Sequence, residues 1–182
     1  MPAKAIKRKA TGSRKRSPSK REGKQPIASR PLMPAIYGTA KSAKGLLDWE
    51  WARQRLNDSH NYVIVTVRPD GRPHAMGMHG LWFGDEFYFG TADSTRKAKN
   101  LAVNANCIVI NEKLDELVIV EGTATKVGYD QLPQGLSDAS KKKYGWPLDP
   151  RKGSSVFKIA PKTVFALPEK QFGTALTRWR FE

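Results

Sequence analysis

The feature that most constrains the fold is a succession of short apolar strands joined by tight turns. Residues 62–67 are rich in β-branched side chains, and Arg68-Pro69-Asp70-Gly71 follows with proline and glycine at turn positions that favour them. The chain returns through residues 73–83, which predicts a β-hairpin. Further strands are expected at 87–89, 107–111, 116–127, 155–159, 163–167 and 175–181. Without βαβ repeats, and with only a few short helices, this order predicts a mainly β fold, an antiparallel barrel.

The segment that follows the aromatic strand at 87–89 predicts a helix. Asp93 or Ser94 is a suitable N-cap. The apolar side chains then recur at helical spacing, so that one stripe faces a core: Ala98, Leu101, Ala102 and Ala105.

Thr95, Arg96 and Lys97 fall in the first turn of this helix. Cations at a helix N-terminus oppose the helix dipole, at a cost of roughly 0.3–1 kcal/mol each. A bound anion would reverse that balance, because free N–H groups, hydroxyls and cations could converge on one phosphate. Two interpretations stand at this point, a phosphate-binding turn and a surface helix whose basic residues are merely solvated.

Positive charge is concentrated at the N-terminus. The chain has a net charge of +15, and residues 1–30 hold eleven basic residues against Glu22 alone. Residues 1–30 have almost no large apolar side chains, so we expect a disordered basic tail. Residues 31–45 are expected to be a linker, and residues 46–182 the folded domain. The runs Lys7-Arg8-Lys9 and Arg14-Lys15-Arg16 suit non-specific nucleic-acid binding, with a purely solubilising tail as the alternative.

Cysteine and histidine give little sign of catalysis. The single cysteine, Cys107, begins an apolar strand, so we expect a buried small hydrophobe and a cytoplasmic protein without disulfides. His60, His74 and His79 show no spacing typical of a metal site, and no metal is expected. No apolar run is long enough for a membrane span.

Five stretches, taken in order, resemble the pyridoxamine 5'-phosphate oxidase-like, flavin-binding split-barrel superfamily over about residues 46–182. They are residues 67–74, Leu81-Trp82-Phe83, residues 91–101, Val120-Glu121-Gly122 and residues 177–181. Residues 95–101 are similar to the phosphate signature of that family, Ser-Arg-Lys followed by a leucine, with Thr95 in place of serine. The resemblance implies a six-stranded antiparallel split barrel of Greek-key type that forms a homodimer with the cofactor at the subunit interface.

The same resemblance assigns expected roles to residues. Thr95, Arg96 and Lys97 would hold the terminal phosphate of FMN, and Thr91 would bond the cofactor near the end of its strand. The cofactor's ring and ribityl chain would be lined by residues of the return strand, and the C-terminal strand would close the site: His74, Met76, Met78 and His79, then Trp179 and Arg180.

The expected function is an FMN-dependent oxidoreductase acting on a small molecule, because the redox chemistry belongs to the cofactor and the protein supplies position. A deazaflavin on the same fold is the first alternative, since its phosphodiester and acidic tail would suit the same basic turn. The second is a non-enzymatic flavin- or haem-binding protein whose basic tail binds nucleic acid.

Overall fold

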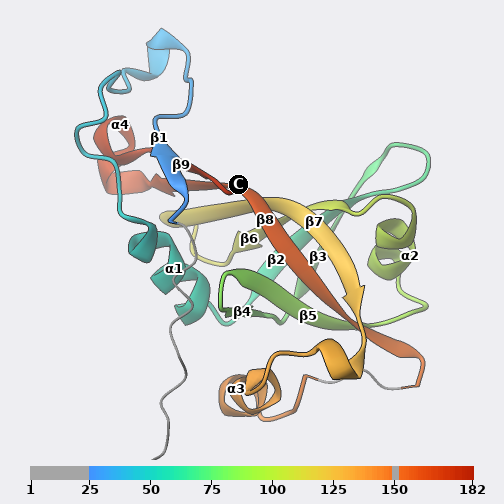
Figure 1. Cartoon of the computed structure of the whole chain (residues 1–182). Helices are drawn as coiled ribbons and strands as arrows, with labels where there is room; N and C mark the ends of the chain where they lie inside the picture. The colour runs from blue at the N-terminus through green and yellow to red at the C-terminus, as the bar shows by residue number, and fades with distance from the viewer. Residues whose placement is uncertain (1–24, 149–151) are drawn as a thin grey trace, which may run out of the picture.

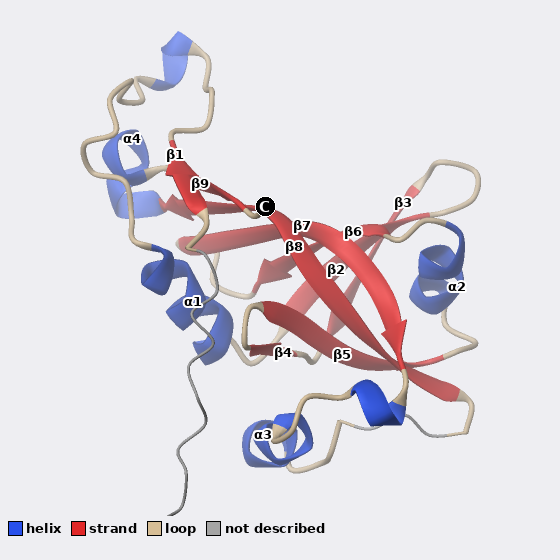
Figure 2. Ribbon diagram, viewed as in Figure 1, coloured by secondary structure: helices blue, strands red, loops and turns tan. Residues whose placement is uncertain are grey.

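The computed structural model describes residues 25–148 and 152–182, and these residues form a mainly β fold (Figures 1 and 2). Within these ranges nine strands form one sheet, and every pairing is antiparallel. The strands are β1 (Ile27–Ser29), β2 (Tyr62–Val67), β3 (Pro73–Met78), β4 (Leu81–Phe83), β5 (Glu86–Ala92), β6 (Asn106–Asn111), β7 (Glu116–Val127), β8 (Ser154–Pro168) and β9 (Thr177–Arg180). The predicted class is confirmed, with more strands than the six expected.

Four short helices lie around this sheet (Figure 2). They are α1 (Trp49–Asp58), α2 (Arg96–Val103), α3 (Leu136–Tyr144) and α4 (Phe172–Ala175), and single 3-10 turns occur at η1 (Ala35–Tyr37), η2 (Tyr129–Gln131) and η3 (Glu169–Gln171). Of the helices in the described ranges, none has the length and apolar content needed to cross a bilayer.

The long strand β8 organises the sheet. It pairs with β7 along nearly its whole length, and β5 pairs with its first half at Ser154–Ile159. β9 pairs with its second half, from Thr163 to Ala166. The remaining strands follow in the order β7, β6, β2, β3 on one side, while β9 and β1 extend the other. One strand therefore joins two ends of the barrel.

The β2–β3 hairpin forms as predicted, with Gly71 at φ +83° and its N–H bonded to Arg68 O at 2.9 Å. The return strand does not run unbroken through residues 73–83. It breaks at His79 and Gly80, after which β4 pairs with β5. A Cβ at Gly80 would overlap the Phe87 ring, so only glycine allows the chain to pass so close to β5 at this point.

The core fills the barrel from alternate positions of its strands. Tyr62, Ile64, Phe87 and Phe89 are almost fully buried. Trp49 of α1 closes the cluster with edge-to-face contacts to three further rings, those of Trp82, Trp179 and Phe181. Cys107 is 6 % exposed, as expected of a small hydrophobe, and burial raises the pKa of its thiol to about 12.

The N-terminal boundary differs from the prediction of a disordered segment over residues 1–30. Residues 1–24 lie outside the described residues, but Ile27–Ser29 forms β1 and pairs with Arg178–Arg180 of β9. The Arg30 guanidinium donates to Leu176 O at 2.6 Å and to Lys44 O at 2.9 Å. The unpaired backbone of β9 recruits this segment although it lacks a strand-like apolar pattern. The part of the expected tail from Ile27 onward therefore belongs to the sheet.

Between β7 and β8 the chain forms η2 and α3, separated by Gly135 at φ +87°. α3 ends in Lys141-Lys142-Lys143. Lys143 is half-buried, and its Nζ lies 3.0 Å from both Tyr62 Oη and Asn57 O. Burial lowers the pKa of Lys143 to about 8.

Candidate cofactor-binding site

The turn between β5 and α2 carries the predicted phosphate-binding residues, and we call it the anchor. The N-cap of α2 is Thr95 rather than the predicted Asp93 or Ser94. The chain first makes a turn in which Thr95 N–H bonds Ala92 O at 3.1 Å. The Thr95 hydroxyl accepts from Ala98 N at 3.4 Å and donates to Ala92 O at 2.8 Å. Arg96 and Lys97 are consequently the first two residues of α2 itself.

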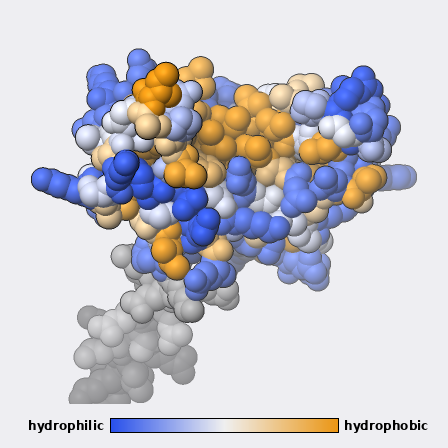
Figure 3. All heavy atoms as spheres, turned by 90° about the horizontal axis from the view of Figure 1, so that it is seen from above, coloured by the Kyte–Doolittle hydropathy of each residue, from blue (hydrophilic) through white to orange (hydrophobic). Residues whose placement is uncertain are grey.

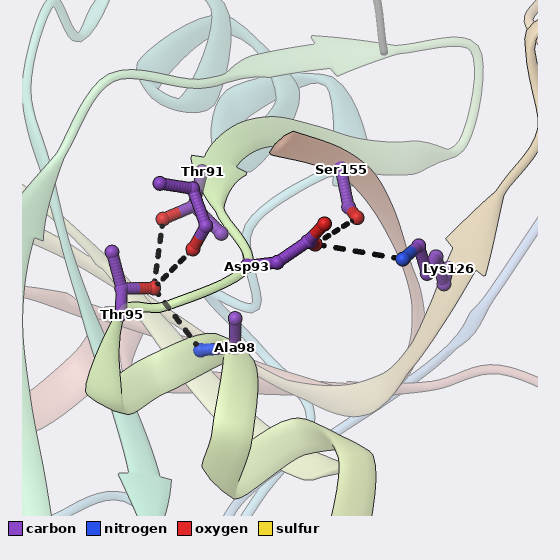
Figure 4. A network of polar contacts seen from close by, with 7 residues as sticks. Thr91, Asp93, Thr95, Ala98, Lys126 and Ser155 are labelled. Atoms are coloured by element: carbon purple, nitrogen blue, oxygen red, sulfur yellow. Dashed lines mark hydrogen bonds and ion pairs between the residues drawn. The ribbon is translucent and has the colours of Figure 1, made fainter. Parts of the chain in front are cut away.

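Two of the predicted hydroxyl groups meet at this turn. Thr91 Oγ1, near the end of β5, lies 3.1 Å from Thr95 Oγ1, and both side chains are partly exposed (Figure 4). The Thr95 hydroxyl thus holds the turn together and stands at the start of the helix, where free N–H groups are directed outward.

Asp93 faces away from the two threonines, toward β7 and β8 (Figure 4). Its Oδ1 accepts a hydrogen bond from Ser155 and lies 3.5 Å from Lys126 Nζ, while its backbone N–H bonds Gly153 O at 3.0 Å. The Ser155 hydroxyl, with the Lys126 cation, lowers the pKa of the Asp93 carboxyl. The nearest acidic side chain is therefore held in its ionised form by groups on the far side of the turn.

Arg96 and Lys97 have no ion-pair partner among the described residues. Arg96 is exposed, whereas Lys97 is half-buried, and its loss of solvation lowers the pKa of the ammonium group. Both cations sit where the helix dipole is also positive. The first turn of α2 is accordingly an uncompensated positive site, and an anion placed there would relieve the repulsion.

A hydrogen-bonded chain connects α2 to β2 and β3. The buried Asn100 donates from Nδ2 to Thr66 Oγ1 at 2.9 Å, and Thr66 Oγ1 donates to His74 O at 3.4 Å. The His74 Nδ1 atom is buried and has no hydrogen-bond partner among the described residues. His74 is therefore a polar group with unused capacity on the strand beside α2.

The remainder of β3 forms an open shelf along the edge of the sheet. Met76 is 49 % exposed and Met78 is half-buried. A Cβ built on Gly77 would meet no atom within 4 Å, so the space over this backbone is free. A cavity of about 530 Å³ lies elsewhere, beside Trp49 and Trp179. The candidate site is thus the anchor turn together with a shelf on the surface, rather than an enclosed pocket.

Three of the predicted site residues lie away from the anchor. His79 sits at the β3–β4 connection and contacts Tyr144 of α3. Trp179 is 1 % exposed and packs against Trp49, while Arg180 is exposed on β9.

The spacing along β8 gives the distance of Trp179 and Arg180 from the anchor. Thr91 pairs with Ser155, and Trp179 pairs with Val164. Ser155 and Val164 are nine positions apart, which is a path of about 30 Å along the strand. One copy of the chain therefore does not bring Trp179 and Arg180 to the anchor.

Sequence reasoning missed the residues that hold the anchor in place. Ser155 and Lys126 lie 62 and 33 positions from Asp93, and no local pattern marks either one. Asn100 carried a weak signal, because a polar residue stands on a helix between Ala98 and Leu101, which are both buried.

Comparison with known proteins identifies relatives of the fold. The model of the pyridoxamine 5'-phosphate oxidase family matches residues 49–167. A search of curated proteins finds no match.

Solved structures with the same fold include general stress protein 26 of Bacillus anthracis, which is 24 % identical in sequence. The match covers 64 % of this chain and 91 % of that protein, with a TM-score of 0.50. An F420 reductase is 19 % identical, with coverage of 62 % and 94 % and a TM-score of 0.50. The heme storage protein HutZ of Vibrio cholerae is 17 % identical, with coverage of 64 % and 90 % and a TM-score of 0.51. At these identities the likeness establishes the fold alone.

Proposed function

This chain belongs to the pyridoxamine 5'-phosphate oxidase family, and from that premise we propose that it binds FMN and acts as an oxidoreductase on a small-molecule substrate. The observation that carries the proposal is the unpaired Arg96 and half-buried Lys97 in the first turn of α2. A desolvated cation without an acidic partner costs free energy unless an anion binds beside it.

The anchor residues fit the phosphate of the cofactor. Arg96 and Lys97 would supply charge-assisted hydrogen bonds, and Thr91 and Thr95 would supply hydroxyls already placed 3.1 Å apart. Asp93 opposes the anion less than a free carboxylate would, because Ser155 and Lys126 engage it.

The shelf along β3 fits the flat part of the cofactor. The open backbone at Gly77 leaves room for a ring, and the partnerless Nδ1 of His74 can bond a polar group beside α2. The cofactor, when bound, supplies the acceptor and donor of electrons. The chain orients it, and the side chains of Met76 and Met78 offer an apolar contact surface.

A second copy of the chain would cover this open site. The outward positions of β2, β6 and β7 are apolar and partly exposed, in contrast to the buried inward positions: Val63, Val65, Ile108, Ile110, Leu117 and Ile119. Figure 3 shows hydrophobic residues gathered across the middle of the face seen from above. An apolar patch of this kind on a soluble domain suits a partner surface, and we propose a homodimer.

A deazaflavin is the second candidate cofactor. The same unpaired cations would suit its phosphodiester and acidic tail, and the open shelf sets no limit on that tail. A flavin- or haem-binding protein without turnover, with the basic tail on nucleic acid, is the third candidate. It draws on the likeness of the fold to that of a heme storage protein.

One set of measurements distinguishes the three candidates. The purified protein is titrated separately with FMN, a deazaflavin and haemin, and binding is followed by absorbance and by quenching of cofactor fluorescence. Tight stoichiometric FMN binding is the expected result, with reduction of the bound FMN by a reduced nicotinamide cofactor, which is oxidised in the same step. Tighter binding of the deazaflavin selects the second candidate, and a Soret band without flavin binding selects the third. Sedimentation at micromolar concentration tests the dimer.

A further inference from the structure

Four aromatic side chains meet on a surface away from the anchor, where three segments of the chain converge. His60 lies between α1 and β2, His79 between β3 and β4, and Tyr144 and Trp146 at the end of α3. The centre of the Tyr144 ring is 5.0 Å from that of His60 and 4.9 Å from that of His79. The two imidazole rings themselves are 5.5 Å apart and nearly perpendicular.

Hydrogen bonds fix the backbone at both histidines. The Tyr144 hydroxyl is 2.9 Å from His60 O and 2.7 Å from Gly80 O, and it accepts from Gly80 N at 3.1 Å. The Glu112 carboxylate accepts from His60 N at 2.7 Å. The two loops that carry the imidazoles are therefore held at a set separation by groups other than the imidazoles.

Both imidazole rings pack against Tyr144, but among the described residues neither ring nitrogen has a hydrogen-bond partner. Both histidines are exposed, and neither forms an ion pair with a carboxylate among the described residues. Solvent reaches both rings, so their unpaired nitrogens are accessible to a ligand.

The separation of the rings matches shared coordination of one ion. With metal–nitrogen bonds of about 2.0–2.1 Å, each ring centre lies roughly 3.2 Å from the metal, and a tetrahedral angle puts two ring centres about 5.2 Å apart. The observed 5.5 Å is close to this value.

We propose that His60 and His79 form a binding site for a divalent transition-metal ion, with water completing the coordination. The tetrahedral separation suits Zn²⁺, and Cu²⁺ is a sensitive probe of the same two imidazoles because it binds a given set of nitrogen ligands most tightly. The ion would link the loop before β2 to the connection between β3 and β4, which Tyr144 already joins by hydrogen bonds.

The neighbouring charges are mixed. Lys143 is a cation whose Nζ lies 5.5 Å from the centre of the Tyr144 ring, and the carboxylates of Glu112 and Asp58 are on the same side of the barrel.

The sequence offers few competing sites, because the third histidine, His74, is on β3 and the one cysteine, Cys107, is buried. Metal binding in this chain can therefore be assigned by single substitutions.

The test uses the full chain without an affinity tag. Cu²⁺ is titrated by calorimetry, and the nitrogen ligands are counted by electron paramagnetic resonance. We expect one ion per chain with two imidazole nitrogens. His60→Asn and His79→Asn should each weaken binding by more than about tenfold and leave one imidazole ligand, since loss of a direct ligand exceeds the usual effect of a supporting residue. His74→Asn is the matched control and should bind Cu²⁺ like the wild type.

A second readout is thermal unfolding with and without Zn²⁺. A ligand that binds the folded state raises the melting temperature, so the wild type and His74→Asn should gain stability while the other two variants should not. Copper binding of unchanged strength in both His60→Asn and His79→Asn overturns the proposal. So does a spectrum with a single nitrogen ligand in the wild type.

Discussion

Replacement of both Arg96 and Lys97 by alanine tests the anchor most directly. Each side chain is expected to form a charge-assisted hydrogen bond with the cofactor phosphate, worth about 1.5–3 kcal/mol. Loss of both would weaken binding by about 3–6 kcal/mol, which is roughly a 100- to 20,000-fold rise in Kd. Fluorescence titration of FMN measures this change.

The stability of the same variant separates binding from folding. Lys97 loses solvation in the fold, both cations oppose the helix dipole, and neither has an acidic partner among the described residues. Alanine also favours a helix interior. We therefore expect the cofactor-free variant to unfold at a temperature no lower than that of the wild type.

Lys99→Ala is the matched control, because Lys99 is an exposed lysine on the same helix whose backbone N–H already bonds Thr95 O. It should retain FMN with a Kd within about twofold of the wild type. The reasoning fails if the double variant keeps its affinity for FMN. It also fails if the double variant melts well below the wild type, because the lost binding would then follow from a damaged helix.

Three other predictions follow from the fold. Gly80→Ala should destabilise the protein by about 1–3 kcal/mol in urea unfolding, because its Cβ would overlap the Phe87 ring, whereas Gly77→Ala, with open space around it, should have a much smaller effect. Lys143 has a folded-state pKa of about 8 against an ordinary value of 10.5, so the unfolded chain binds more protons between these two pH values. The free energy of unfolding should therefore rise with pH across that window. In Lys143→Met this rise should be absent, and a pH profile identical to that of the wild type would contradict the assignment. Deletion of residues 1–24 should abolish retention on DNA at low salt and leave FMN binding intact. Deletion of residues 1–30 should also lower the melting temperature, because it removes β1 and the hydrogen bonds of Arg30.

The parts of the fold that sequence predicts are those specified locally. The β2–β3 hairpin depends on Pro69 and Gly71 within the turn, and both act through their own backbone dihedral angles. The first turn of α2 is similar, since Thr95, Arg96 and Lys97 are adjacent in the chain and lie close together at the helix start without any contact from distant residues. The candidate anchor could therefore be identified before the structure.

The parts that sequence does not predict depend on distant partners. Asp93 is as good an N-cap as Thr95 by local preference, but Ser155 and Lys126 engage its carboxylate and the helix begins two residues later. Gly80 interrupts the return strand because of the Phe87 ring. β1 forms because β9 presents a free edge, and three residues of mixed character give no periodic signal of their own.

The strand β8 ties these observations to the proposed assembly. Its first half holds the anchor turn through Ser155, and its second half holds β9 through Val164 and its neighbours. The β7–β8 pairing has a register shift at Glu121 and Gly122, but about 30 Å of strand path separates the two positions, which a small adjustment does not close. If Arg180 acts on the cofactor, it must therefore do so at the anchor of a second copy. The open shelf on β3 and the apolar outer face of β2, β6 and β7 support the same conclusion, because both would be covered by that second copy.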